Sequence, residues 1–194
     1  MQWEILMPQD KSAYRYSPTA QLLHWLTVLL VAIAWALGTF DDVLPKGAGQ
    51  DAGLFVHISV GLAILVISIV RVPWRMTHTP TAEPTKFSTW MGRWTDPAAR
   101  IAHYALYALL VAVPVTGIAL QFARGNSLPL FGLGEIASPW ISDRAFARSV
   151  KEVHEVMANA LVILACFHAL AALLHHFVFR DRTLVRMLPP RDTP

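Results

Sequence analysis

Apolar residues are gathered into four long blocks, and polar residues occupy the segments between them. The blocks cover residues 19–40, 52–74, 101–122 and 153–179. A helix needs about 20 residues to cross the roughly 30 Å hydrocarbon layer of a membrane, and each block is that long. The pattern therefore predicts an all-α protein in which four transmembrane helices form a bundle, with residues 1–194 as a single integral membrane domain.

Basic residues are sorted by segment, which predicts how the chain is oriented in the membrane. They are frequent before the first block, between the second and third, and after the fourth: Lys11, Arg15, Arg71, Arg75, Lys86, Arg93, Arg100, Arg180, Arg182, Arg186 and Arg191. By the positive-inside rule these segments and both termini are cytoplasmic. The net charge of +3 thus reflects topology and not a nucleic-acid surface, and the expected surroundings are the lipid bilayer. Aromatic and apolar residues spaced along 87–94 also predict a short helix on the cytoplasmic surface.

The fourth block carries two histidines that cannot share one metal ion. His154 and His168 are fourteen residues apart, so on a helix they are separated by roughly 21 Å, within about 40° of the same face. The first block runs outward and places His24 at the depth of His168. The second block starts outside and places His57 at the depth of His154. The sequence therefore predicts two stacked histidine pairs, one near each membrane surface.

Paired imidazoles without a carboxylate at the same depth suit b-type haem, whose iron takes axial histidines. We therefore expect two haem b groups enclosed by the bundle, and Gly61, one turn after His57, would let a porphyrin lie close to the backbone. His103, at the cytoplasmic end of the third block, could bond a haem propionate, a quinone carbonyl or water. Two other readings stay open at this point: a transporter for a metal or protons lined by histidines, and histidines with a structural role.

Several stretches resemble the bacterial cytochrome b561 family of small dihaem membrane cytochromes: "RYSPTAQLLHW", "HISVGLAILVISIVR", "HYALYALLVAVPVTG", "RGNSLPLFGL" and "KEVHEVMANALVILACFHALAALLHHFVFRDRTLVRMLP". The resemblance covers nearly the whole chain and extends more distantly to the cytochrome b subunits of hydrogenases and formate dehydrogenases. It implies a location in the bacterial inner membrane, electron exchange with the quinone pool, and haem iron ligands at His24, His57, His154 and His168. One kind of family member takes electrons from superoxide and reduces ubiquinone.

The expected function is therefore that of an oxidoreductase which passes electrons from superoxide, or another small periplasmic donor, to ubiquinone. Arg124 and Lys151 lie on the periplasmic side and could draw a small anion toward the haem there. They could equally bind haem propionates or lipid phosphate. By position alone, His103, Tyr107 and His175 are candidates for the quinone site. The alternative function is a relay subunit that connects a partner dehydrogenase or periplasmic redox protein to the quinone pool.

Overall fold

The computed structural model describes residues 15–77 and 92–188, and it contains four long helices. They are α1 (Pro18–Thr39), α2 (Ala48–Thr77), α3 (Gly92–Ala123) and α4 (Arg144–Phe177). Each is long and apolar enough to cross a membrane, so the prediction of an all-α bundle with four membrane-spanning helices is confirmed. The surface helix expected at 87–94 falls largely outside the described residues, and α3 begins at Gly92.

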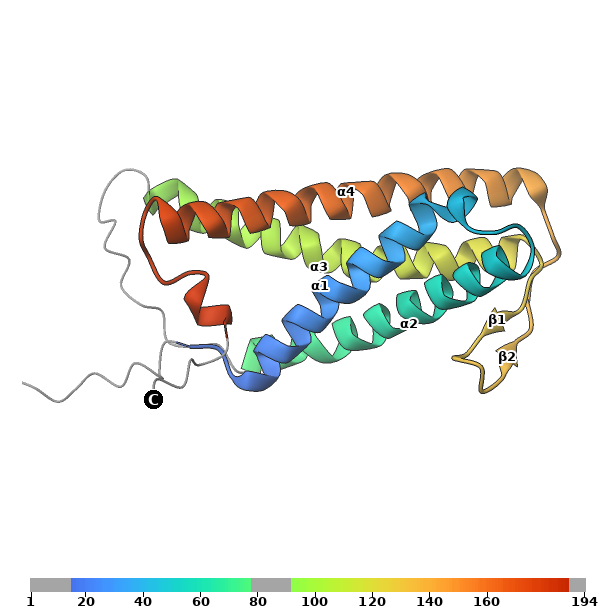
Figure 1. The fold of residues 1–194 in the computed structure, drawn as a ribbon, viewed down its shortest axis with the longest axis horizontal. Helices are drawn as coiled ribbons and strands as arrows, with labels where there is room; N and C mark the ends of the chain where they lie inside the picture. Colours follow the sequence, from blue (N-terminus) through green and yellow to red (C-terminus); the bar gives the residue numbers. More distant parts are fainter. Residues whose placement is uncertain (1–14, 78–91, 189–194) are drawn as a thin grey trace, which may run out of the picture.

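The helices alternate in direction, with α1 packed along α2, α3 along α4, and α2 against α3 (Figure 1). A two-stranded hairpin, β1 (Leu128–Pro129) and β2 (Glu135–Ile136), lies at the end of the bundle where α2 and α4 begin, which we call the hairpin end. The opposite end carries the short helix η3 (Val185–Met187), and we call it the η3 end. Helices α1 and α4 contact each other little, and Figure 1 shows them separating toward the η3 end.

Helix α4 begins at Arg144, well before the predicted start of the fourth block at residue 153. The carboxylate of Asp143 caps it by accepting hydrogen bonds from the backbone N–H groups of Ala145 and Phe146. An acidic N-cap satisfies donors that have no partner inside the helix and also favours the positive end of its dipole. The first turns of α4 are therefore helical although they are too polar to belong to an apolar block.

The chain returns to the start of α1 after α4 ends. Helix η3 and Leu188 present backbone oxygens there to three side chains of the N-terminal region. Arg15 donates to the oxygens of Val185 and Leu188, both at 3.3 Å. The buried Gln21 side chain donates to the Arg186 oxygen at 3.1 Å, and the Trp25 indole donates to the Met187 oxygen at 2.9 Å. The segment after α4 is thereby fixed to α1 on the side where the two helices diverge.

The buried apolar core is small and sits in the middle of the bundle. Its centre is Ile64, Leu110 and Leu161, one residue each from α2, α3 and α4. Leu161 lies halfway along α4 between His154 and His168. Many other apolar side chains of the spans are exposed on the outside of the bundle, as a bilayer allows. An apolar layer therefore separates the two levels at which the predicted histidine pairs lie.

Candidate functional site

The structure brings four histidines together in two pairs, one toward each end of the bundle. At the hairpin end the ring centroids of His57 and His154 are 6.2 Å apart, with an angle of 72° between the ring planes. At the η3 end the centroids of His24 and His168 are 6.5 Å apart, at 75°. These are the same partners that the depth argument selects from the sequence. We refer to them as the His57 pair and the His24 pair.

Both separations match what one shared metal ion requires. A metal–nitrogen bond of about 2 Å, followed by about 1.1 Å from that nitrogen to the ring centre, would separate the centroids of two opposed imidazoles by about 6.2 Å. The residues that the structure describes contain no group of three or more His, Cys, Asp or Glu side chains able to hold a metal ion. Each site thus offers two protein ligands, which fits a metal that brings its remaining ligands with it, as haem iron does.

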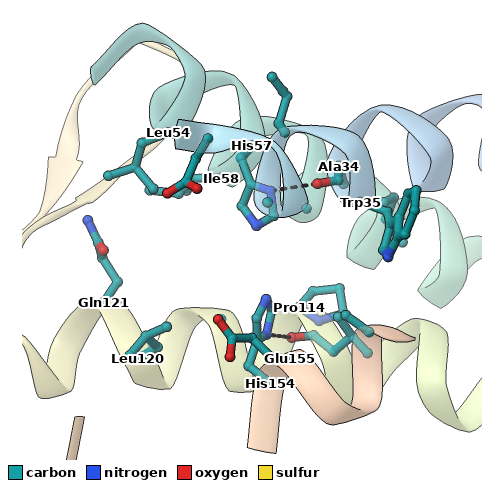
Figure 2. Close-up of a pocket in the computed structure, with 18 of the residues that line it drawn as sticks. Ala34, Trp35, Leu54, His57, Ile58, Pro114, Leu120, Gln121, His154 and Glu155 are labelled. Atoms are coloured by element: carbon teal, nitrogen blue, oxygen red, sulfur yellow. Dashed lines mark hydrogen bonds between the residues drawn. The ribbon is translucent and has the colours of Figure 1, made fainter. Parts of the chain in front are cut away.

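The His57 pair opens into a cavity of about 650 Å³, which all four helices line. This volume falls within the roughly 300–1,000 Å³ typical of sites for small molecules and cofactors. Figure 2 shows His57 and His154 on opposite walls, with their rings directed toward each other. Gly61 also lines the cavity, and a Cβ atom built there would meet no atom within 4 Å. The space beside Gly61 is therefore open, as the expected approach of a porphyrin to the backbone requires.

Each histidine of the His57 pair is seated in a notch on the neighbouring helix. Nδ1 of His57 lies 2.8 Å from the Ala34 carbonyl oxygen of α1 (Figure 2). A Cβ atom on Gly38, four residues further along α1, would lie only 3.0 Å from Cε1 of His57. A carbonyl only accepts hydrogen bonds, so Nδ1 of the ring carries the proton and the Nε2 lone pair stays available for a metal.

The second notch repeats the first on α3. Nδ1 of His154 lies 3.0 Å from the Val113 carbonyl oxygen, and a Cβ atom on Gly117, again four residues on, would lie 3.2 Å from Cε1 of His154. The Thr116 hydroxyl adds a contact, because it donates to the Val113 oxygen at 2.8 Å and lies 3.1 Å from Nδ1 of His154. Both rings of this pair are thus oriented by a backbone oxygen followed by a glycine.

The two notches were not predicted from the sequence, although the chain contains a signal for them. A glycine recurs four residues after the accepting carbonyl in both cases, at Gly38 and Gly117. Small residues in membrane helices allow close helix packing, so the spacing marks a surface where something approaches closely. Which side chain approaches becomes clear only when the relative positions of the helices are known.

Different contacts hold the His24 pair. Arg71 of α2 places Nη2 2.8 Å from Nδ1 of His24, and its guanidinium carbon lies 5.7 Å from the centre of the Tyr107 ring. His103 is 5.1 Å from His168 between ring centroids. A guanidinium only donates hydrogen bonds, so Nδ1 of His24 accepts in this contact, and the proton of a neutral ring then lies on Nε2. Two of the predicted quinone-site candidates, His103 and Tyr107, therefore lie close to this pair.

The third candidate, His175, belongs to a separate contact near the η3 end. Its Nδ1 pairs with the carboxylate of Asp181, which a turn through Arg180, at φ 54°, brings back toward α4. The Thr183 backbone N–H donates to the other carboxylate oxygen at 2.9 Å. Partial burial acts to raise the pKa of Asp181, but the hydrogen bonds from Thr183 and His175 outweigh it, so this pKa lies below its ordinary value. Asp181 lies beyond the predicted helix and did not emerge from the sequence.

Charged groups of both signs line the cavity of the His57 pair. Arg124 and Lys151, the residues predicted to attract an anion, are both in its wall. Lys151 pairs with Glu155 at 3.2 Å, an exposed contact between side chains that are each 53% accessible and that adds little stability. The carboxylates in the wall are Asp41, Asp51 and Glu155. The structure thus brings both predicted cations to the cavity. The expectation that no carboxylate lies at this depth was wrong, because three acidic side chains share the cavity wall with His57 and His154.

Comparison with known proteins gives consistent relatives over almost the full chain. The family model for prokaryotic cytochrome b561 matches residues 15–190. A Yersinia pestis protein named probable superoxide oxidase CybB is 35% identical over 180 residues, which cover 91% of this chain and 97% of that protein. Cytochrome b561 homolog 1 of Escherichia coli K12 is 32% identical, with 91% and 98% covered, and cytochrome b562 of Cereibacter sphaeroides is 29% identical, with 87% and 92% covered. The four membrane-spanning helices and these matches agree, and the chain belongs to the prokaryotic cytochrome b561 family.

Proposed function

We propose that this membrane electron-transfer protein is a superoxide:quinone oxidoreductase that moves electrons between two b haems, one at each histidine pair. Family membership implies b-type haem and electron transfer in the membrane. The observation that carries the rest of the proposal is the geometry of the two pairs, whose centroid separations of 6.2 and 6.5 Å each suit a shared metal. The pairs lie at opposite ends of the bundle, as a path for electrons across a membrane needs.

The protein's own contribution is to bind and orient. Bound haem supplies the one-electron chemistry. His57, His154, His24 and His168 are the proposed iron ligands, and the carbonyls of the two notches fix the tautomer and ring direction of the first two. Such supporting contacts normally affect metal affinity almost as strongly as the ligands themselves do. Gly61 keeps the cavity wall clear beside the His57 pair. With haem bound, two protein ligands at each iron would leave no position for oxygen.

Superoxide is the proposed donor at the hairpin end. Arg124 supports this, because its side chain is exposed in the cavity wall and forms no ion pair within residues 15–77 and 92–188. A cation at the mouth of a low-dielectric cavity raises the local concentration of a small anion. Lys151 contributes less because it shares its charge with Glu155. A relative at 35% identity bears the name probable superoxide oxidase, which agrees with this donor.

Ubiquinone is the proposed acceptor at the η3 end. The distribution of basic residues supports a cytoplasmic position for this end and for both termini. The match to a prokaryotic cytochrome family supports the inner membrane as the location. His103 and Tyr107 are proposed to border the quinone because they lie beside the His24 pair. His175, seven residues beyond His168 on α4, is a further candidate on the same helix.

The first test is the reduced-minus-oxidised visible spectrum of the detergent-purified protein, with haem stoichiometry from a pyridine extract. Two b haems per chain with sharp low-spin bands are expected. One haem per chain would refute the two-site proposal, and a colourless protein would favour the transporter. Carbon monoxide binding to the reduced protein would contradict ligation by histidine on both sides.

The donor is tested by mixing the oxidised protein with a pulse of superoxide and following haem reduction. Arg124→Gln should slow reduction more than Lys151→Gln, whereas Arg144→Gln, an exposed cation at the same end but outside the cavity wall, should leave the rate unchanged. Adding ubiquinone should then reoxidise the haems.

A relay subunit is the second candidate, because the three carboxylates in the cavity wall outnumber the two cations and oppose the attraction of a free anion. A relative named probable Ni/Fe-hydrogenase 1 B-type cytochrome subunit, 26% identical over 141 residues, agrees with such a role. Slow reduction by superoxide that is equal in the wild type and in Arg124→Gln would favour it.

A further inference from the structure

The hairpin at the end of the bundle has an apolar tip that the function above does not use. Residues 130–134 read Leu-Phe-Gly-Leu-Gly and connect β1 to β2. The Leu133 side chain is 92% exposed, Phe131 is 49% exposed and Ile136, in β2, is 48% exposed. Short hairpin turns in water usually carry Asn or Asp with Gly, and leaving large apolar side chains in water is unfavourable.

The backbone of the turn shows that the aromatic residue is held there at a cost. Phe131 and Gly132 have φ values of 55° and 79°, and the Leu133 N–H donates to the Leu130 oxygen at 2.9 Å. Two successive positive φ values define a type I′ turn, in which glycine and asparagine are favoured. A bulky residue in this conformation is rare, and such residues persist where the surroundings or a function require them. The unfavourable conformation therefore makes the Phe131 ring a candidate for a function that a polar turn residue would not serve.

The tip lies beside a membrane-spanning helix and not beyond the end of the bundle. A Cβ atom on Gly132 would lie 3.7 Å from Cζ of Phe55. Phe55 is 39% exposed and falls within the apolar span of α2, about 10 Å along the helix from its start at Ala48. Figure 1 shows the hairpin turning back along this part of α2. The exposed apolar surface of the hairpin is thus continuous with the surface of α2 that faces lipid.

From this continuity we infer that the hairpin tip inserts into the membrane interface beside α2, with lipid as its partner. The expected depth is that of interfacial segments, roughly 5–10 Å into the boundary between headgroups and acyl chains. Leu130 and Leu133 already use their backbone N–H groups within the turn, which lowers the cost of leaving water. Trp140, in the same connection and 44% exposed, is a residue type enriched at this level of the membrane.

The anchor fixes the connection that forms one side of the cavity mouth. Leu128 of β1 and Arg124, just before the hairpin, both line the cavity of the His57 pair. A hairpin held in the interface keeps this wall at the level of the lipid headgroups. The inference rests on the membrane-spanning helices and the exposed tip, and it does not depend on the donor or acceptor proposed above.

The test measures depth with a nitroxide spin label in vesicles of phosphatidylcholine and phosphatidylglycerol. The single cysteine is first removed as Cys166→Ser, and labels are attached at Leu133→Cys and, as a control in the other connection at the same end, at Lys46→Cys. Both positions are exposed, so neither substitution disturbs packing. Relaxation of the label by apolar oxygen and by a water-soluble nickel complex then reports where each site lies.

Oxygen should relax the spin label at position 133 more strongly than the nickel complex does. The nickel complex should have the stronger effect on the label at position 46. Equal access of the nickel complex to both positions would overturn the inference and leave the tip as a contact for a protein. The inference would also be overturned if the label at position 133 became shielded from the nickel complex only when the protein density in the vesicles is raised. That result would indicate contact with a second copy of the chain. An unchanged haem spectrum in both labelled proteins serves as the check on folding.

Discussion

The two histidine pairs have nearly the same ring separation but differ in what holds the rings. At the His57 pair both rings are fixed by backbone oxygens, each followed by a glycine that admits the ring. At the His24 pair, His24 contacts a guanidinium, a mobile side chain at the end of a long stem. Backbone carbonyls place the proton on Nδ1 of His57 and His154, whereas Nδ1 of His24 would have to leave Arg71 and take up the proton before Nε2 could serve as the proposed iron ligand. The first proposed site is therefore pre-organised, and the second would have to adjust when haem binds.

Removing a ligand should have the largest effect and should separate the two sites. We expect His57→Ala to leave one b haem per chain, held by the His24 pair, and His24→Ala to leave one held by the His57 pair. The reason is that only two protein ligands are proposed for each site, and the described residues offer no further cluster of metal-binding side chains. Pyridine extracts give the stoichiometry, and redox titration identifies which haem remains. Two haems per chain in either variant would disprove the assignment of the pairs.

The notches should be the next most sensitive feature. A methyl group at Gly38 would lie 3.0 Å from the His57 ring, and one at Gly117 would lie 3.2 Å from the His154 ring. Overfilling a packed site costs about 1–3 kcal/mol, so Gly38→Ala should reduce haem retention at the His57 pair by roughly tenfold, with Gly117→Ala somewhat milder.

Gly134→Ala serves as the matched control, because a Cβ atom there meets nothing within 4 Å. Haem retention during dilution into haem-free detergent, followed separately for each site by its spectrum, measures the effect. Equal loss of both haems in Gly38→Ala would mean that the notch supports the whole bundle and not one pair.

Arg71 should affect only the His24 pair. A cation beside a haem favours the reduced state, so Arg71→Gln should lower the midpoint potential of this haem by on the order of 50–100 mV, corresponding to about 1–2 kcal/mol at an effective dielectric constant of 20. The His57-pair haem should keep its potential. Arg182→Gln, an exposed cation at the same end, is the control. A uniform shift of both haems would contradict the contrast between the sites.

The smallest expected effect concerns pH. The pKa of Asp181 is lower in the folded protein than its ordinary value. Its contribution to stability is therefore fully present above the unfolded-state pKa, about 3.9, and is lost as the pH falls through the lower folded-state value. Asp181→Asn should flatten the dependence of the melting temperature on pH below about 4, whereas Asp42→Asn should not. Identical melting-temperature profiles for the wild type and Asp181→Asn would show that the contact between His175 and Asp181 does not stabilise the η3 end.

The features that could be predicted from the sequence are those set within a single helix. The apolar blocks predicted the four spans, and the depth of each histidine within its block predicted which histidines the structure brings side by side. Features that depend on how neighbouring helices and loops are placed relative to one another could not be predicted from the sequence. The notch at Gly38 requires the register of α1 against α2, and the contact between His175 and Asp181 requires a positive φ at Arg180, which L-residues seldom adopt. The start of α4 was missed because its cap, Asp143, lies in a polar segment.

The small apolar cluster in the middle of the bundle has a consequence for the cell's energy supply. Ile64, Leu110 and Leu161 have no hydrogen-bonding side chains, and among the partly buried residues packed against them Tyr107 alone carries a polar group. An electron can tunnel through such a layer, whereas a proton needs a chain of water or polar groups along which to hop. The layer would therefore act as an insulator for protons, and the protein could carry redox current across the membrane without short-circuiting the proton gradient. Placing a polar residue at Leu161 would test this directly, as a proton leak in sealed vesicles.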